Sequence, residues 1–461
     1  MSTRDVASLR GMARAAVNDS KACIRAPGAV ASWRAAIDGS ILKGRHNELA
    51  GKSVLVGVRS QFFSALAMLE LDGLASRMVI VPPDFTVESL ASAIEQAGVE
   101  AIVCDDEASD FGANLPRIIV GPSAPCDEPR MEAIDTEWVM PTSGTTGAPK
   151  LVAHRLAGLL GATERPSSET AAPVWGTFYD IRRYGGMQIF LRAATRGATL
   201  VLTEADESLS DHVARMAGAG VTHMSGTPSH WRRLLMSPDA LRISLRYVRL
   251  SGEIADRAIL DSLKATYREA QIVHAYASTE AGVGFEVKDG REGFPASYLN
   301  GVGDVEMRVV DGSLRVRSRR TARRYVGRDD LCIADSDGFV DTDDLVELRG
   351  DRFYFKGRRA GTINVGGLKV HPEEVEQVIN MHEAVYMSLV KARRSPITGD
   401  IIVAQVILKD GEPSPERKRA LREEIAESCR AQLGRRKTPA TIDFVPSVAM
   451  SAGGKLLRGR S

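Results

Sequence analysis

The sequence predicts an α/β protein with two unequal domains, and three observations support this fold class. The chain has 461 residues, which is longer than a domain with a single hydrophobic core, since such cores stop growing at roughly 250–300 residues. Short apolar runs alternate with helix-like segments in its first part, as in βαβ units with a parallel sheet. Beyond residue 300, short runs separated by Asp-Gly and Gly-Asp turns predict antiparallel hairpins.

The first part of the chain is expected to form parallel strands joined by helices. Apolar runs bounded by turn residues predict strands over 53–58, 78–82, 101–105, 198–202, 221–226, 246–252 and 271–278. Helical spacing between these runs predicts helices, for example over 87–98 and 209–220. Several of the strands end in small or hydroxyl residues, so we expect loops for ligand binding at the carboxyl edge of the sheet.

The rest of the chain predicts a β-rich subdomain and then a small α+β domain. Hairpin-like runs over 305–319, 338–348 and 352–358 complete a large N-terminal domain of layered α/β subdomains. A self-contained pattern of helices and strands follows. We therefore expect two domains, 1–357 and 358–461.

Composition excludes several classes of protein. The formal net charge of +1 gives no support to nucleic-acid binding. No run of about 18 apolar residues predicts a transmembrane segment, and the N-terminus lacks the apolar core of a signal peptide. The cysteines are odd in number, far apart and never in CxxC spacing, which argues against disulfides and structural zinc and favours the cytoplasm; they are Cys23, Cys104, Cys126, Cys332 and Cys429.

One loop, MPTSGTTGAPK (140–150), gathers hydroxyls, glycines and a lysine between two strand-like runs. Glycines let backbone approach a polyphosphate, and oriented N–H groups can form an anion nest. The loop is not a Walker motif, because Pro149 precedes Lys150 and Leu151 follows it. Taken alone, the loop is either a phosphate site or a flexible connection.

Four later motifs decide between these alternatives. TSGTTGAPK is followed by AYASTEAG (275–282), DTDDLVEL (341–348), GRRAGTINVGGLKVHPEEVE (357–376) and MSAGGKLLR (450–458). In this order the motifs resemble the adenylate-forming superfamily of acyl-CoA synthetases, peptide-synthetase adenylation domains and luciferases. The resemblance extends from about residue 50 to the C-terminus, and it implies a shortened N-terminal region and a small domain that rotates between two half-reactions.

The resemblance implies an ATP site. Its β- and γ-phosphates would be held by Thr142, Ser143, Gly144, Thr145, Thr146, Gly147 and Lys150. An aromatic face stacks on a purine and a carboxylate suits a hard cation, so Tyr276 is expected against adenine, Thr279 at the α-phosphate and Glu280 on Mg²⁺. Further nucleotide contacts are expected from Gly252, Glu253, Ala277 and Ser278.

Other positions are implied for ribose, catalysis and the thiol. Asp344 and Arg358 would hold the ribose, with Asp343 replacing the middle glycine of the family's Thr-Gly-Asp motif. Lys455 matches the family's catalytic lysine, whose ammonium offsets repulsion between a carboxylate and the α-phosphate; Thr279 and Glu280 are its expected catalytic partners. The hinge has Ala360, and the backbone of Gly366 and Gly367 would flank pantetheine.

The acid pocket is expected from Tyr184, Gly185 and His274, together with Arg182. In register, Arg182 replaces a histidine that many acyl-CoA synthetases carry. An arginine there could pair with a second anion on the substrate. It could equally face solvent or the edge of the sheet.

The implied function is an AMP-forming acid–thiol ligase. With ATP and Mg²⁺ it would convert a fatty or aryl carboxylic acid to an acyl-adenylate, then pass the acyl group to coenzyme A. One alternative acceptor is the phosphopantetheine of a separate carrier protein, since no carrier domain is expected after Ser461. The other alternative is a nucleotide or acyl sensor without turnover. Neither the acid nor the oligomeric state follows from the sequence.

Overall fold

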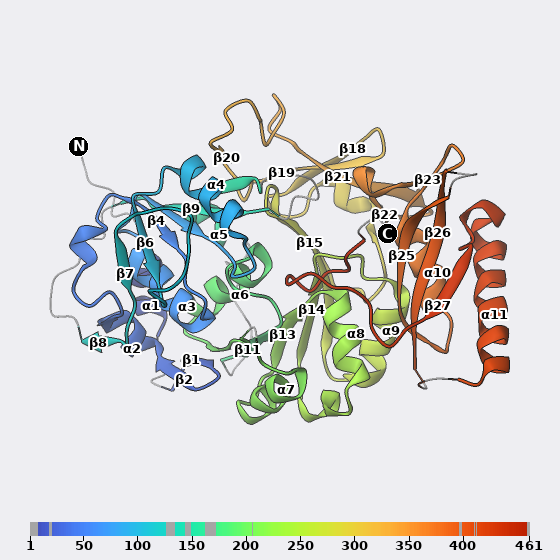
Figure 1. Ribbon diagram of the computed structural model, residues 1–461, viewed down its shortest axis with the longest axis horizontal. Helices are drawn as coiled ribbons and strands as arrows, with labels where there is room; N and C mark the ends of the chain where they lie inside the picture. The colour runs from blue at the N-terminus through green and yellow to red at the C-terminus, as the bar shows by residue number, and fades with distance from the viewer. Residues whose placement is uncertain are drawn as a thin grey trace.

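The structure is a computed structural model that describes residues 8–17, 21–125, 134–142, 149–161, 172–204, 206–395, 399–409, 411 and 413–458. Figure 1 shows the N-terminal part at one end, the middle of the chain at the centre and a small C-terminal domain at the other end. The predicted α/β class, with a large N-terminal and a smaller C-terminal domain, is confirmed. No helix in these ranges is long and apolar enough to cross a membrane.

The first sheet contains the strands predicted over 53–58, 78–82 and 101–105, which pair in parallel as expected. Its antiparallel edge, β9 with β10, flanks the loop of residues 140–150. The helices α3 and α4 begin at Ser60 and Thr86, whose side chains accept from backbone N–H groups of the first turn. In spatial order the strands are β20 (Arg324–Val326), β10 (Leu151–Arg155), β9 (Glu137–Pro141), β5 (Arg77–Ile80), β4 (Ser53–Val56), β6 (Ala101–Cys104) and β7 (Arg117–Ile119). The helices are α3 (Gln61–Leu71), α4 (Val87–Ala97) and α5 (Leu156–Leu160).

The second sheet carries the loops of the candidate site at the carboxyl ends of β13, β14 and β15. Its central strands are parallel and almost wholly buried, as expected for a sheet covered on both faces. Spatially it runs β16 (Gly282–Val287), β15 (Gln271–Ser278), β14 (Tyr247–Ser251), β13 (His223–Gly226), β11 (Val174–Thr177), β12 (Thr199–Val201), β1 (Cys23–Ala26) and β2 (Ala29–Ser32). The pairing of β1 with β12 was not predicted.

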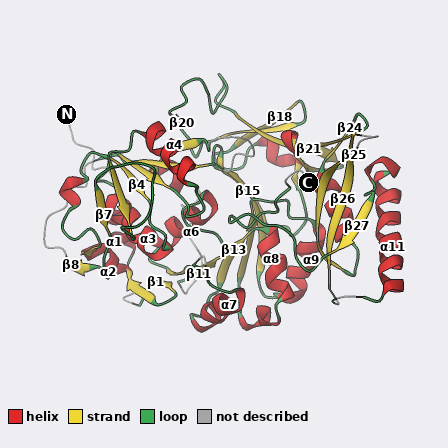
Figure 2. Ribbon diagram, in the orientation of Figure 1, coloured by secondary structure: helices red, strands yellow, loops and turns green. Residues whose placement is uncertain are grey.

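Helices cover both faces of this second sheet (Figure 2). One side packs in the same core as α6 and α1, and the other packs with α7, α8 and α9. The bounds are α1 (Leu9–Ala16), α2 (Trp33–Asp38), α6 (Tyr184–Ala194), α7 (Leu209–Gly218), α8 (Pro228–Met236) and α9 (Arg257–Thr266). Short elements nearby are β3 (Gly39–Ser40), η1 (His46–Glu48), β8 (Ala124–Pro125) and η2 (Pro238–Arg242).

A third, antiparallel sheet forms the predicted β-rich subdomain. It consists of β17 (Phe294–Pro295), β22 (Arg352–Arg358), β21 (Val340–Arg349), β19 (Ser313–Arg317) and β18 (Glu306–Val310), with η3 (Ala296–Asn300) beside it. This sheet ends at Arg358, and the next strand begins at Ile363 after the short turn η4 (Arg359–Gly361). The predicted hinge residue Ala360 lies in that turn.

The C-terminal domain packs two helices on a fourth sheet. Its elements are β23 (Ile363–Val365), β24 (Leu368–Val370), α10 (Pro372–Asn380), β25 (Val385–Ser395), β26 (Gly399–Leu408), α11 (Pro415–Leu433), η5 (Arg435–Lys437) and β27 (Thr441–Phe444). The chain then leaves this domain, and in Figure 1 the red segment that follows runs back to the centre of the molecule. This return places the last motif beside the second sheet.

Candidate active site

Lys455 lies at the tip of a tight turn that the returning segment forms. Ser451 N–H donates to the carbonyl of Lys455 over 2.8 Å, and Met450 pairs with Leu456. Gly454 adopts a φ of +70°, in the left-handed region that glycine tolerates best. The turn therefore presents the lysine side chain on a short, fixed hairpin rather than on a loose tail.

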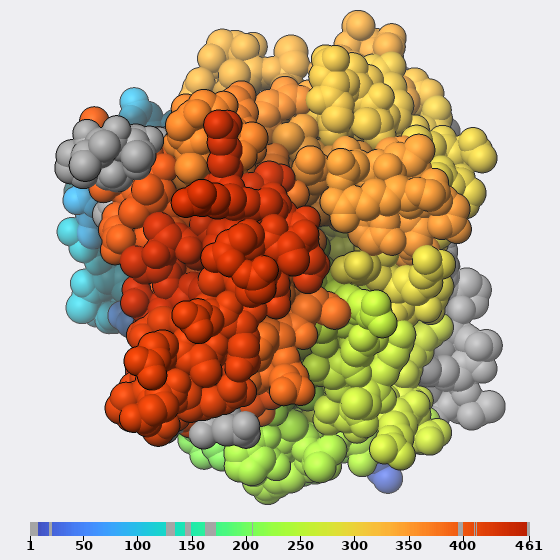
Figure 3. Space-filling view, turned by 90° about the vertical axis from the view of Figure 1, so that its right-hand side faces the viewer, coloured from blue at the N-terminus to red at the C-terminus, as the bar shows by residue number. Residues whose placement is uncertain are grey.

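The turn is docked onto the large domain. Thr227 Oγ1 donates to the Gly454 carbonyl over 2.6 Å, and Leu456 N–H donates to Glu253 Oε1 over 2.9 Å. Gly454 also packs directly against the ring of His230, where a Cβ atom would overlap the ring. Figure 3 shows the C-terminal domain, in orange and red, packed against the green and yellow middle part of the chain.

This docking sets the position and the charge of Lys455. Its Cε would lie 3.2 Å from a Cβ built on Gly252, at the end of β14. The residue is exposed at its surface, while packing of its turn against the large domain partly desolvates the ammonium and lowers its pKa, and Arg358 adds to that shift. Glu253 and Asp344 oppose it. The ammonium thus stands in a polar site with groups of both signs around it.

Asp344 and Arg358 come together, as predicted. They are cross-strand neighbours on β21 and β22, and Arg358 Nε lies 3.3 Å from Asp344 Oδ1. Tyr276 donates its hydroxyl to Asp344 Oδ2 over 2.7 Å. Asp343, at the motif's glycine position, takes a φ of +58°, so the turn keeps the left-handed geometry that a glycine would provide.

The ring of Tyr276 belongs to an aromatic cluster. It stacks on Phe355 at 5.3 Å between ring centroids and on Phe285 at 5.5 Å. Burial, reinforced by Asp344, raises the pKa of the Tyr276 hydroxyl well above its usual value, which keeps it a donor. The ring of Tyr276, expected against adenine, is thus already stacked on two phenylalanine rings.

The phosphate loop is described only at its ends. Ser143, Gly144, Thr145, Thr146 and Gly147 lie outside the described residues. Thr142 N–H donates to the Lys150 carbonyl over 2.8 Å, which closes the hairpin of β9 and β10. The Lys150 ammonium lies over the ring of Tyr325, 5.2 Å from its centroid.

The hydroxyl of Tyr325 also lies close to Glu280, the expected metal ligand. Burial and the neighbouring carboxylate of Glu280 raise the pKa of its hydroxyl to about 12. Ala322 N–H donates to the Glu280 carbonyl over 2.8 Å. Thr279 precedes Glu280, and its backbone contacts the buried His154, whose pKa burial lowers to about 4. Tyr325 therefore links the phosphate loop to the end of β15.

Other predicted contacts occupy nearby turns. Gly252 has a φ of +86° beside Lys455. Glu253 accepts from Ser229 N–H over 3.0 Å as well as from Leu456. Ser278 Oγ accepts from Ala281 N–H over 3.0 Å at the end of β15, directly after Ala277. Of these residues, Glu253 is the one that bonds the edge of the second sheet to the turn of Lys455.

Two predicted thiol contacts lie elsewhere. Gly366 and Gly367 form the turn of the β23–β24 hairpin with φ values of +54° and +86°, and Gly367 N–H donates to Asn364 Oδ1. Figure 1 shows β23 well away from the red segment that carries Lys455. In this arrangement the small domain presents its lysine, not these glycines, to the large domain.

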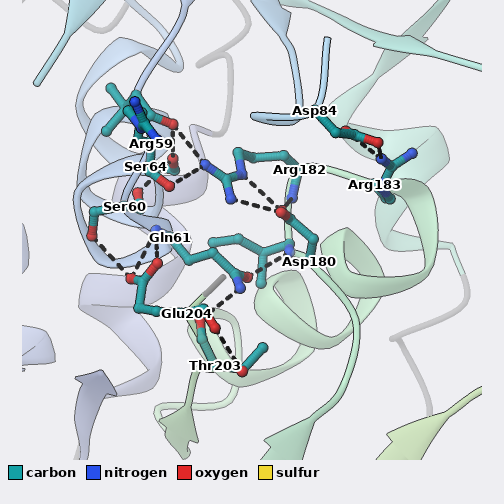
Figure 4. Close-up of polar contacts among 12 residues, drawn as sticks. Arg59, Ser60, Gln61, Ser64, Asp84, Asp180, Arg182, Arg183, Thr203 and Glu204 are labelled. Atoms are coloured by element: carbon teal, nitrogen blue, oxygen red, sulfur yellow. Dashed lines mark hydrogen bonds and ion pairs between the residues drawn. The ribbon is translucent and has the colours of Figure 1, made fainter. Parts of the chain in front are cut away.

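The structure corrects the expectation for Arg182. All three nitrogens of its guanidinium donate to protein oxygens: Nε and Nη2 to Asp180 over 2.7 and 2.6 Å, and Nη1 to the carbonyls of Val58 and Arg59. The side chain is 1% exposed, so it fastens two segments together and offers no approach to a substrate anion. In Figure 4 the neighbouring Arg183 turns instead to Asp84.

The other residues expected in the acid pocket lie in two different places. Tyr184 and Gly185 begin α6, and Tyr184 is buried against the ring of His154. His274 lies with its Nε2 2.9 Å from the carbonyl of Arg291, and burial lowers its pKa. Its ring is thus engaged by the loop before the third sheet, while a Cβ built on Gly185 would lie 3.5 Å from the ring of Tyr179.

Two family models match the chain. One, described as AMP-binding enzyme, matches residues 61–325, and the other, described as AMP-binding enzyme C-terminal domain, matches residues 374–455. The chain belongs to the AMP-binding enzyme family. This confirms the resemblance to the adenylate-forming superfamily and places the protein among AMP-forming acid–thiol ligases.

Curated relatives of this AMP-binding enzyme have low sequence identity to it but align with most of the chain. A 2-succinylbenzoate–CoA ligase of Bacillus velezensis is 25% identical over 425 residues, which cover 85% of this chain and 79% of the relative. A p-hydroxybenzoic acid–AMP ligase of Mycobacterium tuberculosis is 28% identical over 343 residues, covering 69% and 47%. Their names describe acids with an aromatic ring.

Solved structures share the fold of this AMP-binding enzyme. The anthranilate CoA ligase AuaEII superposes with a TM-score of 0.80 at 17% identity, covering 99% of this chain and 97% of that one. The amide bond synthetase McbA of Marinactinospora thermotolerans gives 0.77 at 18% identity, covering 97% and 98%. At these identities the likeness establishes the fold alone.

Three contacts of this AMP-binding enzyme were not foreseen from sequence. His230 supports Gly454, Tyr325 joins Lys150 to Glu280, and Arg183 lies beside Gly453, with its Cδ 3.6 Å from a Cβ built there. Only His230 had a sequence signal: the Thr-Pro pair before it starts α8, and Thr227 and His230 form a capping box.

Proposed function

We propose that this protein activates a carboxylic acid with ATP and transfers the acyl group to coenzyme A. The observation that carries the proposal is the docked turn, which places Lys455 against Gly252 and among Glu253, Asp344 and Arg358. A mobile cation at this point suits the joining of two anions. It would be brought in and withdrawn by movement of the small domain.

In the first half-reaction a carboxylate oxygen of the acid attacks the α-phosphorus of ATP, and pyrophosphate leaves. The Lys455 ammonium stabilises the negative charge shared by the two reactants. Asp344 offers acceptor oxygens to the ribose hydroxyls, with Arg358 and Tyr276 fixing its orientation.

In the second half-reaction the thiol sulfur attacks the acyl carbonyl carbon, and AMP leaves. The turn of Gly366 and Gly367 would approach the pantetheine after rotation about Ala360. Relatives named as CoA ligases favour coenzyme A as the acceptor. The same chemistry would load a carrier protein, which stays the second candidate acceptor.

Mg²⁺ fits the residues around Glu280. A protein usually holds this ion through one or two carboxylates while substrate phosphates and water complete its octahedron. Glu280 supplies such a carboxylate beside Tyr325, whose ring lies under the Lys150 ammonium. The described residues contain no cluster of three or more metal-ligand side chains, and this arrangement needs none. When bound, the ion would supply charge neutralisation on the phosphates.

Acid-dependent exchange of labelled pyrophosphate into ATP tests the proposal. The panel should contain fatty, aryl and dicarboxylic acids, with 2-succinylbenzoate among them because relatives bear its name. Exchange with at least one acid, followed by thioester formation when coenzyme A is added, is expected. The absence of exchange with every acid would favour a sensor, and exchange without thioester would favour a carrier protein.

A further inference from the structure

Two tyrosine side chains reach from α6 and the loop before it to the carboxyl edge of the second sheet. Tyr179 lies in the loop between β11 and α6. Its hydroxyl donates to the Ser251 carbonyl over 2.7 Å and lies 3.0 Å from Ser251 Oγ. Tyr184 begins α6, and its hydroxyl contacts the backbone of Val283 on β16. The two tyrosines are 6% and 8% exposed, so both phenols are packed between α6 and the sheet.

The ring of Tyr179 lies next to the support of the Lys455 turn. It packs edge to face on the ring of His230, with 5.8 Å between the centroids, and Gly454 packs against that same imidazole. On the side of α6, a Cβ built on Gly185 would lie 3.5 Å from the Tyr179 ring. The ring therefore fills the space between the start of α6 and the side chain on which the turn rests.

The loop that carries Tyr179 is fixed by its neighbours. Tyr179 N–H donates to Thr177 Oγ1 over 2.9 Å. Arg182 joins Asp180 to two backbone carbonyls that follow β4, as Figure 4 shows. Gly186 packs against the carbonyl of Asp180, where a Cβ atom would overlap it. The phenol is therefore a fixed wall rather than a mobile gate, and the buried Arg182 helps to hold it there.

The Tyr179 hydroxyl lies close to the expected position of the reacting carboxyl. It is bonded at Ser251, and the next residue, Gly252, is the one against which Lys455 packs. One residue of a strand rises about 3.3 Å, so little depth separates the phenol from the reaction centre. Tyr276, expected at the adenine, is engaged by the third sheet instead. The body of the acid is thus left to extend toward α6, where Tyr179 meets it.

We propose that Tyr179, with Tyr184 beside it, limits the acid to a short aliphatic chain of about two to four carbons, the length that a depth of one strand residue admits. The inference rests on the proposed function and names its substrate class. Added methylenes would press on a buried, hydrogen-bonded ring, and packed interiors resist added volume. Tyr179 is therefore a specificity-determining residue, which excludes longer and aromatic acids and takes no part in the bond changes.

The test measures pyrophosphate exchange with acetate, propionate, butyrate, hexanoate, octanoate and benzoate. For the wild type we expect kcat/KM for hexanoate and benzoate to lie roughly 10- to 100-fold below that for propionate, the effect of overpacking a filled site. Tyr179→Ala removes the ring and should raise the ratio of hexanoate to propionate by about 10-fold or more. Tyr179→Phe keeps the ring and should keep the wild-type profile.

Tyr267→Ala is the matched control for Tyr179→Ala. Tyr267 is also 6% exposed and donates its hydroxyl to a backbone carbonyl, that of Ala240, over 2.8 Å. It packs in the core formed with α7, α8 and α9. Its removal should lower the melting temperature, as the loss of any buried ring does, and should leave the ratio of hexanoate to propionate unchanged.

Three outcomes overturn the inference. A wild type that exchanges best with hexanoate, octanoate or benzoate leaves the ligase intact and removes the size limit. Equal losses for all acids in Tyr179→Ala, with an unchanged ratio, would make Tyr179 structural. If that variant does not fold, Tyr179→Leu takes its place and the wild-type profile decides. No exchange with any acid would overturn the proposed function and this inference with it.

Discussion

Thr227 donates its hydroxyl to the carbonyl oxygen of Gly454 over 2.6 Å, and so joins two residues 227 positions apart. Glu253 repeats the link by accepting from Leu456 N–H. Both bonds use backbone atoms of the turn that carries Lys455. Docking of the small domain and placement of the Lys455 ammonium are therefore one event, and the two can be tested together.

The first prediction concerns the contact of Gly454 with His230. Burial lowers the pKa of His230 to about 3, so the ring is a neutral packing surface and not a base. Gly454→Ala would force its methyl into this ring from a backbone with φ of +70°. We expect pyrophosphate exchange to fall by 10-fold or more, about 1.4 kcal/mol of lost docking.

Gly350→Ala is the matched control for that variant. Gly350 has a φ of +61° and nothing within 4 Å of its added Cβ, so alanine there introduces backbone strain without overlap. It should leave exchange nearly unchanged. If both variants lose exchange equally, backbone strain rather than docking explains the effect.

The second prediction separates the two half-reactions at Lys455. Lys455→Ala should reduce pyrophosphate exchange by about 100-fold or more, the usual effect of removing a group that stabilises transition-state charge. It should still convert a pre-formed acyl-adenylate and coenzyme A to thioester at nearly the wild-type rate. Equal losses in the two assays would contradict the role assigned to this lysine.

The pH dependence of exchange provides a third prediction. Burial and Arg358 lower the pKa of Lys455 from its usual 10.5, so the ammonium is lost at a lower pH than that of a free lysine. Exchange should therefore decline on the alkaline side before pH reaches that value. Lys455→Arg keeps its charge at all these pH values, and its residual activity should not show the same decline.

The fold could be predicted from sequence because its signals are local. Alternating apolar runs located β4, β5 and β6, and helical spacing located α4 and α7. The N-terminal strand β1 was missed, because its four residues gain their place only by pairing with β12, far away in the chain. Such a pairing leaves no pattern in a short segment.

Contacts within the candidate site could be anticipated where a motif carries its own geometry and were missed where the partners are distant in the chain. Asp344 and Arg358 face each other across one hairpin, so their pairing follows from a short stretch. Arg182 has the residue type and the register expected for binding a substrate anion. Its guanidinium nevertheless donates to Asp180 and to the carbonyls of Val58 and Arg59. Register fixes a position in the chain but not the direction of a long side chain.

Tyr325 gives a fourth prediction. Its ring supports the Lys150 ammonium and its hydroxyl approaches Glu280, so the two halves of the side chain can be tested separately. Tyr325→Phe keeps the ring and should raise the Mg²⁺ concentration needed for half-maximal exchange by roughly threefold to tenfold, the worth of about one hydrogen bond. Tyr325→Leu should in addition raise KM for ATP. A variant pair with identical Mg²⁺ and ATP dependences would show that only packing matters.

The last prediction concerns a buried polar contact between the domains. Arg232 binds Asp256 with two bonds of 2.7 and 2.6 Å and donates to the Tyr386 carbonyl of the small domain, while Asn380 donates to Asp256 over 3.1 Å. Ser388 Oγ fixes the amide of Asn380. The bonds from Arg232 to Tyr386 and from Asn380 to Asp256 cross between the domains, so they form only in this docked arrangement, which the proposed function assigns to adenylation.

Asn380→Ala should therefore shift the domain equilibrium. Losing one hydrogen bond to a charged group costs about 1.5–3 kcal/mol, which predicts a fall in pyrophosphate exchange of roughly 10-fold or more while conversion of pre-formed acyl-adenylate to thioester is maintained. Asn47→Ala, at an exposed position of the large domain, should change neither rate. If Asn380→Ala instead lowers both rates and the melting temperature together, the amide serves folding of the small domain. A selective loss of exchange means that this contact stabilises the orientation of the small domain in which adenylation takes place.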